Sequence, residues 1–384
     1  MVNVGICFGG KSVEHDISVI TYMQVESAID KGKYKVVPLY LGKDNIFYMS
    51  KKLYTSRNFY MNNKLYTNKN KNILDINNKS NRFKVVNFIK KNNKVYANKV
   101  KLDCVILCVH GKGLEDGSLV SFFKVLGVPC TAPDNLTSAV FHNKYLTKAI
   151  LKESKIPTLN YELISIDKWE KNKENILENT FFNNLNENNK VIIKPVNLGS
   201  SIGVKIAKNK EELEKALDYA FMFDNLVITE KCINEFREFN QAIYKYKGEI
   251  KISKIEEIKN DSNFYGFSEK YESDKATRDL QPKISQNLKV RIHKTTKRIQ
   301  EIFNNKGVIR VDYLYRVSDK KLFVNEVNVI PGALSYYLFE PKEIYFNELI
   351  DNLIIEAVND YSIEDATISN FESNVLHGKK ISKK

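Results

Sequence analysis

The sequence predicts an α/β fold, in which strands and helices alternate along most of the chain. Two observations support this class: short apolar runs rich in Val and Ile recur between segments with helical spacing, and several of these runs end in glycine-rich turns. The length of 384 residues exceeds that of one typical domain, so we expect two or three units. Hydrophobic residues make up 43% of the chain, which is enough for a sizeable core.

Up to residue 133 the chain predicts a first α/β unit. Strands are expected at residues 2–10, 34–42 and 103–111, and helices at 18–32 and 118–127. Gly32 and Gly127 close the two helices, as glycine commonly does at a helix C-terminus. Residues 44–100 are polar, rich in tyrosine and irregular, so we expect short strands and mobile loops there.

Two further units are expected after Pro133. One continuous helix should lie between Asn135, its N-cap, and Pro157, and a linker rich in Asn, Lys and Glu should follow at 168–188. The second unit has strands at 191–195, 202–206 and 226–230 and a helix at 210–223. The third has antiparallel strands at 238–246, 249–258, 308–316 and 321–329 and a helix at 288–303.

The formal net charge of +14, from 60 basic and 46 acidic residues, would suit nucleic acid or phosphorylated ligands. Much of the excess lies in Lys- and Asn-rich segments such as "NNKLYTNKNKNILDINNKS", and no basic stripe interleaved with aromatics or known reader motif accompanies it. We therefore interpret the charge as solvated surface and expect no nucleic-acid partner. A non-catalytic or nucleic-acid-binding protein is the alternative from a different functional class.

The cysteines and the apolar segments indicate a cytoplasmic protein. The five cysteines are odd in number, form no C-x-x-C pair and lie in or beside strand-like runs, where free thiols pack as small hydrophobes. This usage favours a reducing compartment. The N-terminus opens directly into a strand, and no apolar run reaches the roughly 18 residues that a membrane span needs. We expect neither a leader nor a membrane partner.

Residues 5–12, "GICFGGKS", match the phosphate-loop pattern G-x-x-x-x-G-K-[ST]. In a true phosphate loop the variable residues wrap around the phosphates and expose their amides. Here residues 6–8 continue the apolar run of the strand, so the turn consists of Gly9, Gly10 and Lys11. A phosphate-loop nucleotide-binding protein is therefore a disfavoured alternative. The same turn could offer its amides and Glu14 to a small substrate at the edge of the sheet.

Two strands near the C-terminus carry hard oxygen ligands. The period-two alternation of a strand places Arg310 and Asp312 on one face in "VIRVDYLY", and Glu326 and Asn328 on one face in "NEVN". Pairing these strands would make a magnesium site suited to nucleotide phosphates. Each acid could instead pair with a nearby Lys or Arg, but burying an unpaired charge is costly, which favours a metal.

Lys194 lies at the end of an apolar strand and faces a loop of small residues at 199–203. A cation beside glycine and serine amides is suited to clamping a phosphate group. The plainer interpretation, a surface lysine before an ordinary hairpin, is weakened by the buried strand that leads to it.

Six motifs in order resemble the D-alanine:D-alanine ligase family of ATP-grasp enzymes. They are "FGGKSVEHDIS" at 8–18, "HGKGLEDG" at 110–117, "KPVNLGSSIGV" at 194–204, "FYGFSEKYESD" at 264–274, "RVDY" at 310–313 and "NEVNVIPG" at 325–332. The resemblance implies an ATP-grasp fold of three α/β subdomains with a Rossmann-like N-terminal unit. We expect the subdomains at 1–133, 134–231 and 232–384, with ATP between the last two.

The resemblance also implies the role of individual residues. Lys144 and Lys194 match the lysines on the ATP phosphates, and the loop with Ser200 and Ser201 approaches the same phosphates. The residues implied around the adenine are Glu230, Lys231 and Ile233, with Glu238 on the ribose hydroxyls. The implied ligands of Mg²⁺, or of Mn²⁺, are Asp312, Glu326 and Asn328.

For the amino-acid substrates, the resemblance implies that Glu14 holds the ammonium of the first D-alanine and that Ser200 links Glu14 to a mobile loop. Arg310 and the amide of Gly332 match the oxyanion site. Lys270 and Tyr271 match residues of a lid, which we expect at 260–279 because an acyl phosphate must be kept from water. Tyr271 goes with an amine acceptor in the family.

The chain departs from the family pattern after Gly332, where Tyr337 and Leu338 replace the pair that contacts the carboxylate of the acceptor. The implied reaction is ATP-dependent joining of two D-alanines through an acyl phosphate, for peptidoglycan precursor synthesis. A ligase with another acceptor, such as D-serine, is the nearest alternative. D-alanine and ATP are the expected small-molecule partners, and the family suggests a homodimer.

Overall fold

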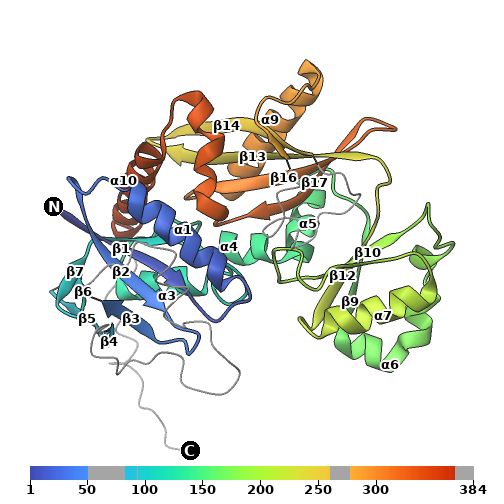
Figure 1. Cartoon of the computed structure of the whole chain (residues 1–384), viewed down its shortest axis with the longest axis horizontal. Helices are drawn as coiled ribbons and strands as arrows, with labels where there is room; N and C mark the ends of the chain where they lie inside the picture. Colours follow the sequence, from blue (N-terminus) through green and yellow to red (C-terminus); the bar gives the residue numbers. More distant parts are fainter. Residues whose placement is uncertain (51–82, 93, 260–276, 368–384) are drawn as a thin grey trace, which may run out of the picture.

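The computed structural model describes residues 1–50, 83–92, 94–259 and 277–367. Three larger sheets with their helices form three masses: the N-terminal unit lies at the lower left, the C-terminal sheet at the top and the central unit at the right (Figure 1). The segment 260–276, which holds most of the expected lid with Lys270 and Tyr271, lies outside the described residues.

The N-terminal sheet has the strand order β4-β3-β2-β1-β8. Its strands are β1 (Val2–Gly9), β2 (Tyr34–Leu41), β3 (Phe47–Ser50), β4 (Phe83–Val85) and β8 (Cys104–Leu107). Its helices are α1 (His15–Ala28) and α3 (Ser118–Leu126). The central strand β1 runs parallel to both β2 and β8, and a small separate sheet contains β5 (Phe88–Lys91), β6 (Lys94–Ala97) and β7 (Val100–Leu102).

Strand β1 contradicts the phosphate-loop alternative. Gly5 lies inside the strand and pairs with Val37 and Val105, and residues 6–8 are buried in the core. The turn begins at Gly9 and Gly10, whose φ angles of 92° and 98° suit glycine, and Lys11 is exposed to solvent. The variable residues of the pattern therefore cannot wrap around a phosphate.

The central sheet has the order β11-β10-β12-β9. Its strands are β9 (Tyr161–Ser165), β10 (Val191–Pro195), β11 (Lys205–Ala207) and β12 (Leu226–Lys231), and its helices are α6 (Ile166–Leu177) and α7 (Lys210–Phe221). The linker predicted at 168–188 is wrong over its first half, because Trp169 is buried against the sheet and holds α6 in place. This unit has a hydrophobic core of its own.

The C-terminal sheet has the order β15-β14-β13-β16-β17. Its strands are β13 (Phe236–Tyr246), β14 (Glu249–Lys259), β15 (Thr277–Asp279), β16 (Ile309–Arg316) and β17 (Lys321–Asn328). Helix α9 (Gln286–Phe303) packs on β13 and β14. Helix α10 (Phe346–Asp365), which the sequence analysis did not identify, returns to contact β8 and α1.

The single helix predicted between Asn135 and Pro157 is wrong. The segment forms α4 (Asn135–His142) and α5 (Lys144–Glu153), and Asn143 between them has an extended backbone. Asp134, not Asn135, caps α4, because its carboxylate accepts the Thr137 amide at 2.8 Å. The Asn143 side chain likewise accepts the Leu146 amide at 2.9 Å, so a second N-cap starts a new helix.

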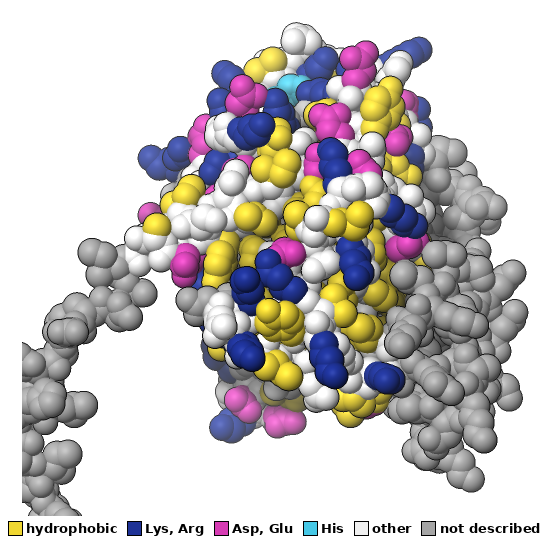
Figure 2. All heavy atoms as spheres, turned by 90° about the vertical axis from the view of Figure 1, so that its left-hand side faces the viewer, with side chains coloured by type: hydrophobic (Ala, Val, Ile, Leu, Met, Phe, Trp, Pro, Cys, Tyr) yellow, Lys and Arg dark blue, Asp and Glu magenta, His cyan; other side chains and the backbone are white. Residues whose placement is uncertain are grey.

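On the face shown in Figure 2, Lys and Arg side chains lie singly or in small groups among hydrophobic, polar and acidic ones. The described residues of this face thus form no continuous basic stripe. Within the described ranges, no helix has the length and apolarity that crossing a bilayer would require.

Candidate active site

Two adjoining cavities lie where the three units meet. The lysine cavity, of about 130 Å³, lies between the central and C-terminal sheets and has Lys144 and Lys194 in its wall. The acidic cavity, of about 110 Å³, lies between the N-terminal unit and the C-terminal sheet. Gly199, Glu238 and Glu326 line both cavities. A ligand that fills the first cavity would therefore reach the second at these residues.

The register of the C-terminal sheet sets a row of oxygen-bearing side chains across four strands. Asn240 on β13 lies opposite Glu256 on β14 and also opposite Asp312 on β16, and Asp312 lies opposite Glu326 on β17. Directly opposed residues of antiparallel strands point to the same face. The row therefore forms part of the wall of the acidic cavity.

Asp312 is 2% exposed, yet its charge is paired. Arg310 donates two hydrogen bonds to its carboxylate, each of 2.7 Å, and Asn328 donates a third at 3.0 Å. Burial lowers the pKa of Arg310, but the charge of Asp312 outweighs it and raises that pKa well above its usual value. The argument that burial of Asp312 by itself requires a metal is therefore wrong.

The proposed metal ligands nevertheless lie together. Asp312 and Glu326 are opposed residues, and Asn328 lies opposite Arg310 on the same face, as strand alternation predicts. In the described part of the chain, no group of three or more His, Cys, Asp or Glu side chains could hold a metal ion. A cation at this place would thus depend on two carboxylates, an amide oxygen and ligands supplied by a substrate.

A buried triad of charges forms one wall of the lysine cavity. The carboxylate of Glu230, which is 0% exposed, lies 2.7 Å from Lys148 Nζ and 2.8 Å from Lys194 Nζ. Burial raises the pKa of Glu230, but the two lysines outweigh it and bring the pKa down to about 2. Glu230 stays ionised and compensates one of the two buried cations.

Lys148 is a functional candidate that the sequence analysis missed. Its side chain is only 1% exposed, and Glu230 is the partner that its ammonium group contacts. The spacing of four residues from Lys144 places both lysines on one face of α5, and this signal could have identified it.

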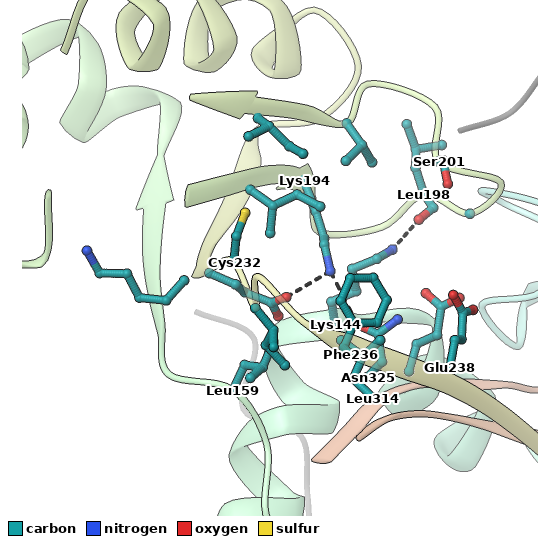
Figure 3. A pocket seen from close by; sticks show the side chains of 18 residues that line it. Lys144, Leu159, Lys194, Leu198, Ser201, Cys232, Phe236, Glu238, Leu314 and Asn325 are labelled. Carbon is teal, nitrogen blue, oxygen red and sulfur yellow. Dashed lines mark hydrogen bonds and ion pairs between the residues drawn. The ribbon is translucent and has the colours of Figure 1, made fainter. Parts of the chain in front are cut away.

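Lys144 is positioned by the break between α4 and α5. Its backbone amide donates to Val196 O at 3.1 Å, and its ammonium group donates to the carbonyl of Leu198. Figure 3 shows the amino groups of Lys144 and Lys194 on the wall of the same cavity. The amino group of Lys194 donates to Glu230 at 2.8 Å and to Asn325 at 3.3 Å. Burial lowers the pKa of Lys144, and a bound anion would raise that pKa again.

The loop after β10 connects the central unit to the N-terminal unit. Ser200 donates a hydrogen bond to the carboxylate of Glu14, and both Ser200 and Ser201 have a left-handed backbone, with φ of 52° and 57°. A Cβ at Gly199 would lie 3.2 Å from the Glu14 carboxylate, so the absence of a side chain permits this approach. Burial, followed by the charge of Glu115, raises the pKa of Glu14.

The remaining predicted residues are divided between the two cavities and the core. Lys231, Ile233 and Ser201 line the lysine cavity, and Glu238 lines both cavities. Glu14, Ser200, Arg310, Gly332 and Tyr337 line the acidic cavity. Leu338 is fully buried in the core and lines neither cavity. The acidic cavity also contains Glu256, Asn240 and Arg278, which the sequence analysis did not single out.

Comparisons with known proteins find matches over most of the chain. A family model described as "D-ala D-ala ligase N-terminus" matches residues 3–133, and one described as "D-ala D-ala ligase C-terminus" matches residues 150–355. A D-alanine–D-alanine ligase of Thermosipho africanus is 39% identical over 381 residues, which cover 98% of each chain.

Two solved structures have a similar fold. One is a D-alanine–D-alanine ligase from Coxiella burnetii, with a TM-score of 0.75, 22% identity and coverage of 95% of this chain and 96% of that one. The other is the VanG D-Ala:D-Ser ligase from Enterococcus faecalis, with a TM-score of 0.74, 24% identity and coverage of 93% and 99%. At these identities they support the fold alone.

Replacing Lys148 by methionine removes one of the two cations on Glu230 and leaves much of its buried charge uncompensated. We expect the free energy of unfolding to fall by about 3 kcal/mol. The fluorescence of Trp169, the only tryptophan, reports urea unfolding of the central unit. The exposed Lys152 on the same helix is a matched control, and Lys152→Met should change the value by less than about 0.5 kcal/mol. Equal losses in both variants would contradict the triad.

The pKa of Glu230 also predicts a pH dependence of stability. Because the folded state lowers this pKa from 4.5 to about 2, the stabilisation is present above pH 4.5 and is lost as the pH falls toward 2. Between pH 5 and pH 3 the native protein should lose about 2 kcal/mol more than the variant Glu230→Gln. Urea unfolding at both pH values measures the difference, and parallel losses in the two proteins would refute it.

Proposed function

The chain belongs to the D-alanine–D-alanine ligase family, and on this premise we propose that it uses ATP to join two D-alanines for peptidoglycan precursor synthesis. The observation that carries the proposal is the meeting of the two cavities at Glu326. This residue is the member of the side-chain row that also lines the lysine cavity, where a triphosphate and an amino acid would have to meet.

The chemistry of the residues that line the lysine cavity suits ATP. Its phosphates would lie near the ammonium groups of Lys144 and Lys194 and the amides of the loop at 199–203, and these groups would stabilise the negative charge of the phosphates. The nucleoside would lie beside Lys231 and Ile233, and Glu238 could accept hydrogen bonds from the ribose hydroxyls.

Asp312, Glu326 and Asn328 fit a divalent cation, because hard oxygen ligands suit Mg²⁺ and the three side chains share one sheet face. When bound, such an ion would neutralise charge on the phosphate oxygens. Arg310 and Asn328 donate hydrogen bonds to the carboxylate of Asp312, so the position of this carboxylate is fixed before an ion binds.

In the proposed first step, a carboxylate oxygen of D-alanine attacks the γ-phosphorus of ATP, and the bond to the β-phosphate oxygen breaks to release ADP. Glu14 would hold the ammonium group of this D-alanine, and Ser200 orients Glu14. In the second step, the amine of the acceptor attacks the acyl carbon, phosphate leaves and the amine loses a proton. Arg310 and the amide of Gly332 would stabilise the oxyanion.

Several parts of the proposal concern features beyond this site. The lid expected at 260–279 is wrong over its last three residues, because Thr277–Asp279 form β15 and pair with β14. The rest of that segment, with Lys270 and Tyr271, lies outside the described residues. A homodimer and a cytoplasmic location belong to the same proposal. D-Serine is the alternative acceptor, because Tyr337, at the position that departs from the family pattern, lines the acidic cavity with a side chain that has a hydroxyl group.

The test is phosphate release, which should require both D-alanine and Mg²⁺ and should accompany a product with the mass of the dipeptide. Lys194→Ala should lower kcat/KM by at least about 100-fold, because it removes a charged contact to the phosphates. Lys11→Ala, which truncates the exposed lysine of the phosphate-loop pattern, should change kcat/KM by less than about threefold. Far-UV circular dichroism checks that both variants are folded.

The reverse ranking of the two variants would overturn the assignment of Lys194. Absence of phosphate release with D-alanine would overturn the function itself. Affinity for nucleic acid that falls steeply with salt would instead support the binding-protein alternative.

A further inference from the structure

Asp224 lies in the turn between α7 and β12, lines neither cavity and takes no part in the proposed reaction. It is 6% exposed, and burying a carboxylate is costly unless donors satisfy both of its oxygens. Each oxygen here accepts two hydrogen bonds. Oδ2 accepts from the backbone amide of Asn197 at 2.7 Å and from its side-chain Nδ2 at 2.9 Å. Oδ1 accepts from the amide of Asn225 at 2.9 Å and from Lys112 Nζ at 3.2 Å.

The donors to Asp224 come from two units of the protein. Asn225 is its neighbour in the chain, and Asn197 belongs to the loop after β10 of the same central unit. Lys112 belongs to the turn between β8 and α3 of the N-terminal unit, and other residues of that turn line the acidic cavity. The carboxylate therefore connects a loop of the central unit to a turn of the N-terminal unit.

The loop residue that this carboxylate holds, Asn197, lies between the two carbonyl groups that position Lys144. The Val196 carbonyl accepts the Lys144 amide at 3.1 Å, and the Leu198 carbonyl accepts its ammonium group (Figure 3). The Asn197 side chain also reaches the N-cap of α5, because its Oδ1 accepts Asn143 Nδ2 at 2.9 Å. A shift of Asn197 would therefore move both carbonyls, and with them the lysine that faces the phosphates.

The same loop positions the carboxylate that is expected to bind the first D-alanine. Ser200 donates a hydrogen bond to Glu14, and a Cβ at Gly199 would lie 3.2 Å from the Glu14 carboxylate. The loop at 196–200 thus contacts the ATP side of the site at its start and the amino-acid side at its end. A residue that fixes this loop acts on both substrates without touching either.

We propose that Asp224 is a positioning residue that links the two substrate sites. By fixing Asn197 it holds the loop in the conformation that places Lys144 and Glu14. The inference rests on the proposed ligase function. A carboxylate that only stabilised the turn before β12 would change the amount of folded enzyme, which enters kcat and leaves KM unchanged. A positioning role predicts changes in KM, because misplaced binding groups weaken the contacts with both substrates.

Replacing Asp224 by alanine removes the connections of the loop and of the N-terminal unit together. Phosphate release measured against each substrate should show that Asp224→Ala raises KM for ATP and KM for D-alanine by at least about tenfold each. Calorimetric titration with a non-hydrolysable ATP analogue should show a loss of affinity of similar size. Loss of folded protein would lower the number of binding sites in that titration and leave their affinity unchanged.

Replacing Lys112 by methionine removes the connection to the N-terminal unit and leaves the hydrogen bonds to Asn197 in place. The Lys112 side chain is 50% exposed, so its ion pair contributes little to stability and the variant should fold. Glu14 belongs to the N-terminal unit, whereas Lys144 stays connected to the loop. Lys112→Met should therefore raise KM for D-alanine by about threefold and change KM for ATP by less than about 1.5-fold.

Asp103→Ala is the matched control. The Asp103 carboxylate also accepts a backbone amide that is distant in the chain, that of Asn3 at 2.9 Å, and it pairs with Lys101. These contacts lie at the end of β1 opposite to the turn that leads to Glu14. Both KM values of this variant should change by less than about twofold.

Far-UV circular dichroism checks that Asp224→Ala is folded. If it is not, Asn197→Ala takes its place, because this change removes only the side-chain bonds that join Asp224 to Asn143. Asn197 is half-buried, and its truncation should raise both KM values by about threefold or more.

The outcomes separate the positioning role from the ligase function. No phosphate release with D-alanine in the native protein would overturn the proposed function. Phosphate release with KM values that stay within about twofold of the native ones in Asp224→Ala, or in Asn197→Ala, would overturn the positioning role alone, even if kcat falls. Equal changes of the two KM values in Lys112→Met would overturn the connection between the two units.

Discussion

The antiparallel register of the C-terminal sheet is the constraint on which the site depends. It sets Asp312 opposite Glu326 and Asn240 opposite both Asp312 and Glu256, so four strands contribute one row of side chains to one face. A slip of one residue in any of these pairings would turn the row to the other face, where α9 packs on β13 and β14. The sheet is held against slippage by a hydrophobic core that includes Phe239, Val311 and Tyr313 from the alternate positions.

The buried lysines of this protein are only partly neutralised by the protein itself, so a bound polyanion would neutralise them further. Glu230 compensates only part of the charge of the lysines around it, and burial lowers the pKa of Lys144. On the other side, several acids surround the acidic cavity, and Arg310 is committed to Asp312. Lysines and glutamates are equal in number in the wall of the lysine cavity, whereas acids outnumber arginines in the wall of the acidic cavity. A divalent cation and a substrate ammonium group would balance the charge of the acidic cavity.

How much of the fold and of the site the sequence predicts depends on how far apart in the chain the interacting residues lie. Strand alternation predicts that Arg310 shares a face with Asp312, and the register confirms it. The break at Asn143 was missed because an apolar helical pattern continues through it, although the Asn143 side chain accepts the Leu146 amide and so caps a new helix. Lys148 and Glu256 were missed because the contacts of each are made with a residue of another element. Lys148 pairs with Glu230 on β12, and Glu256 accepts a hydrogen bond from Asn240 on β13. Leu338 lies beside a cavity residue in sequence, yet the tight turn at 332–338 directs it into the core.

The central claim is that Glu326 joins the nucleotide in the lysine cavity to a divalent cation on the carboxylate row. Calorimetric titration with a non-hydrolysable ATP analogue, with and without Mg²⁺, tests it most directly. The account predicts that Mg²⁺ raises the affinity of the native protein by at least about tenfold, and that of Glu326→Gln by less than about twofold. A Mg²⁺ effect of the same size in both proteins would contradict it.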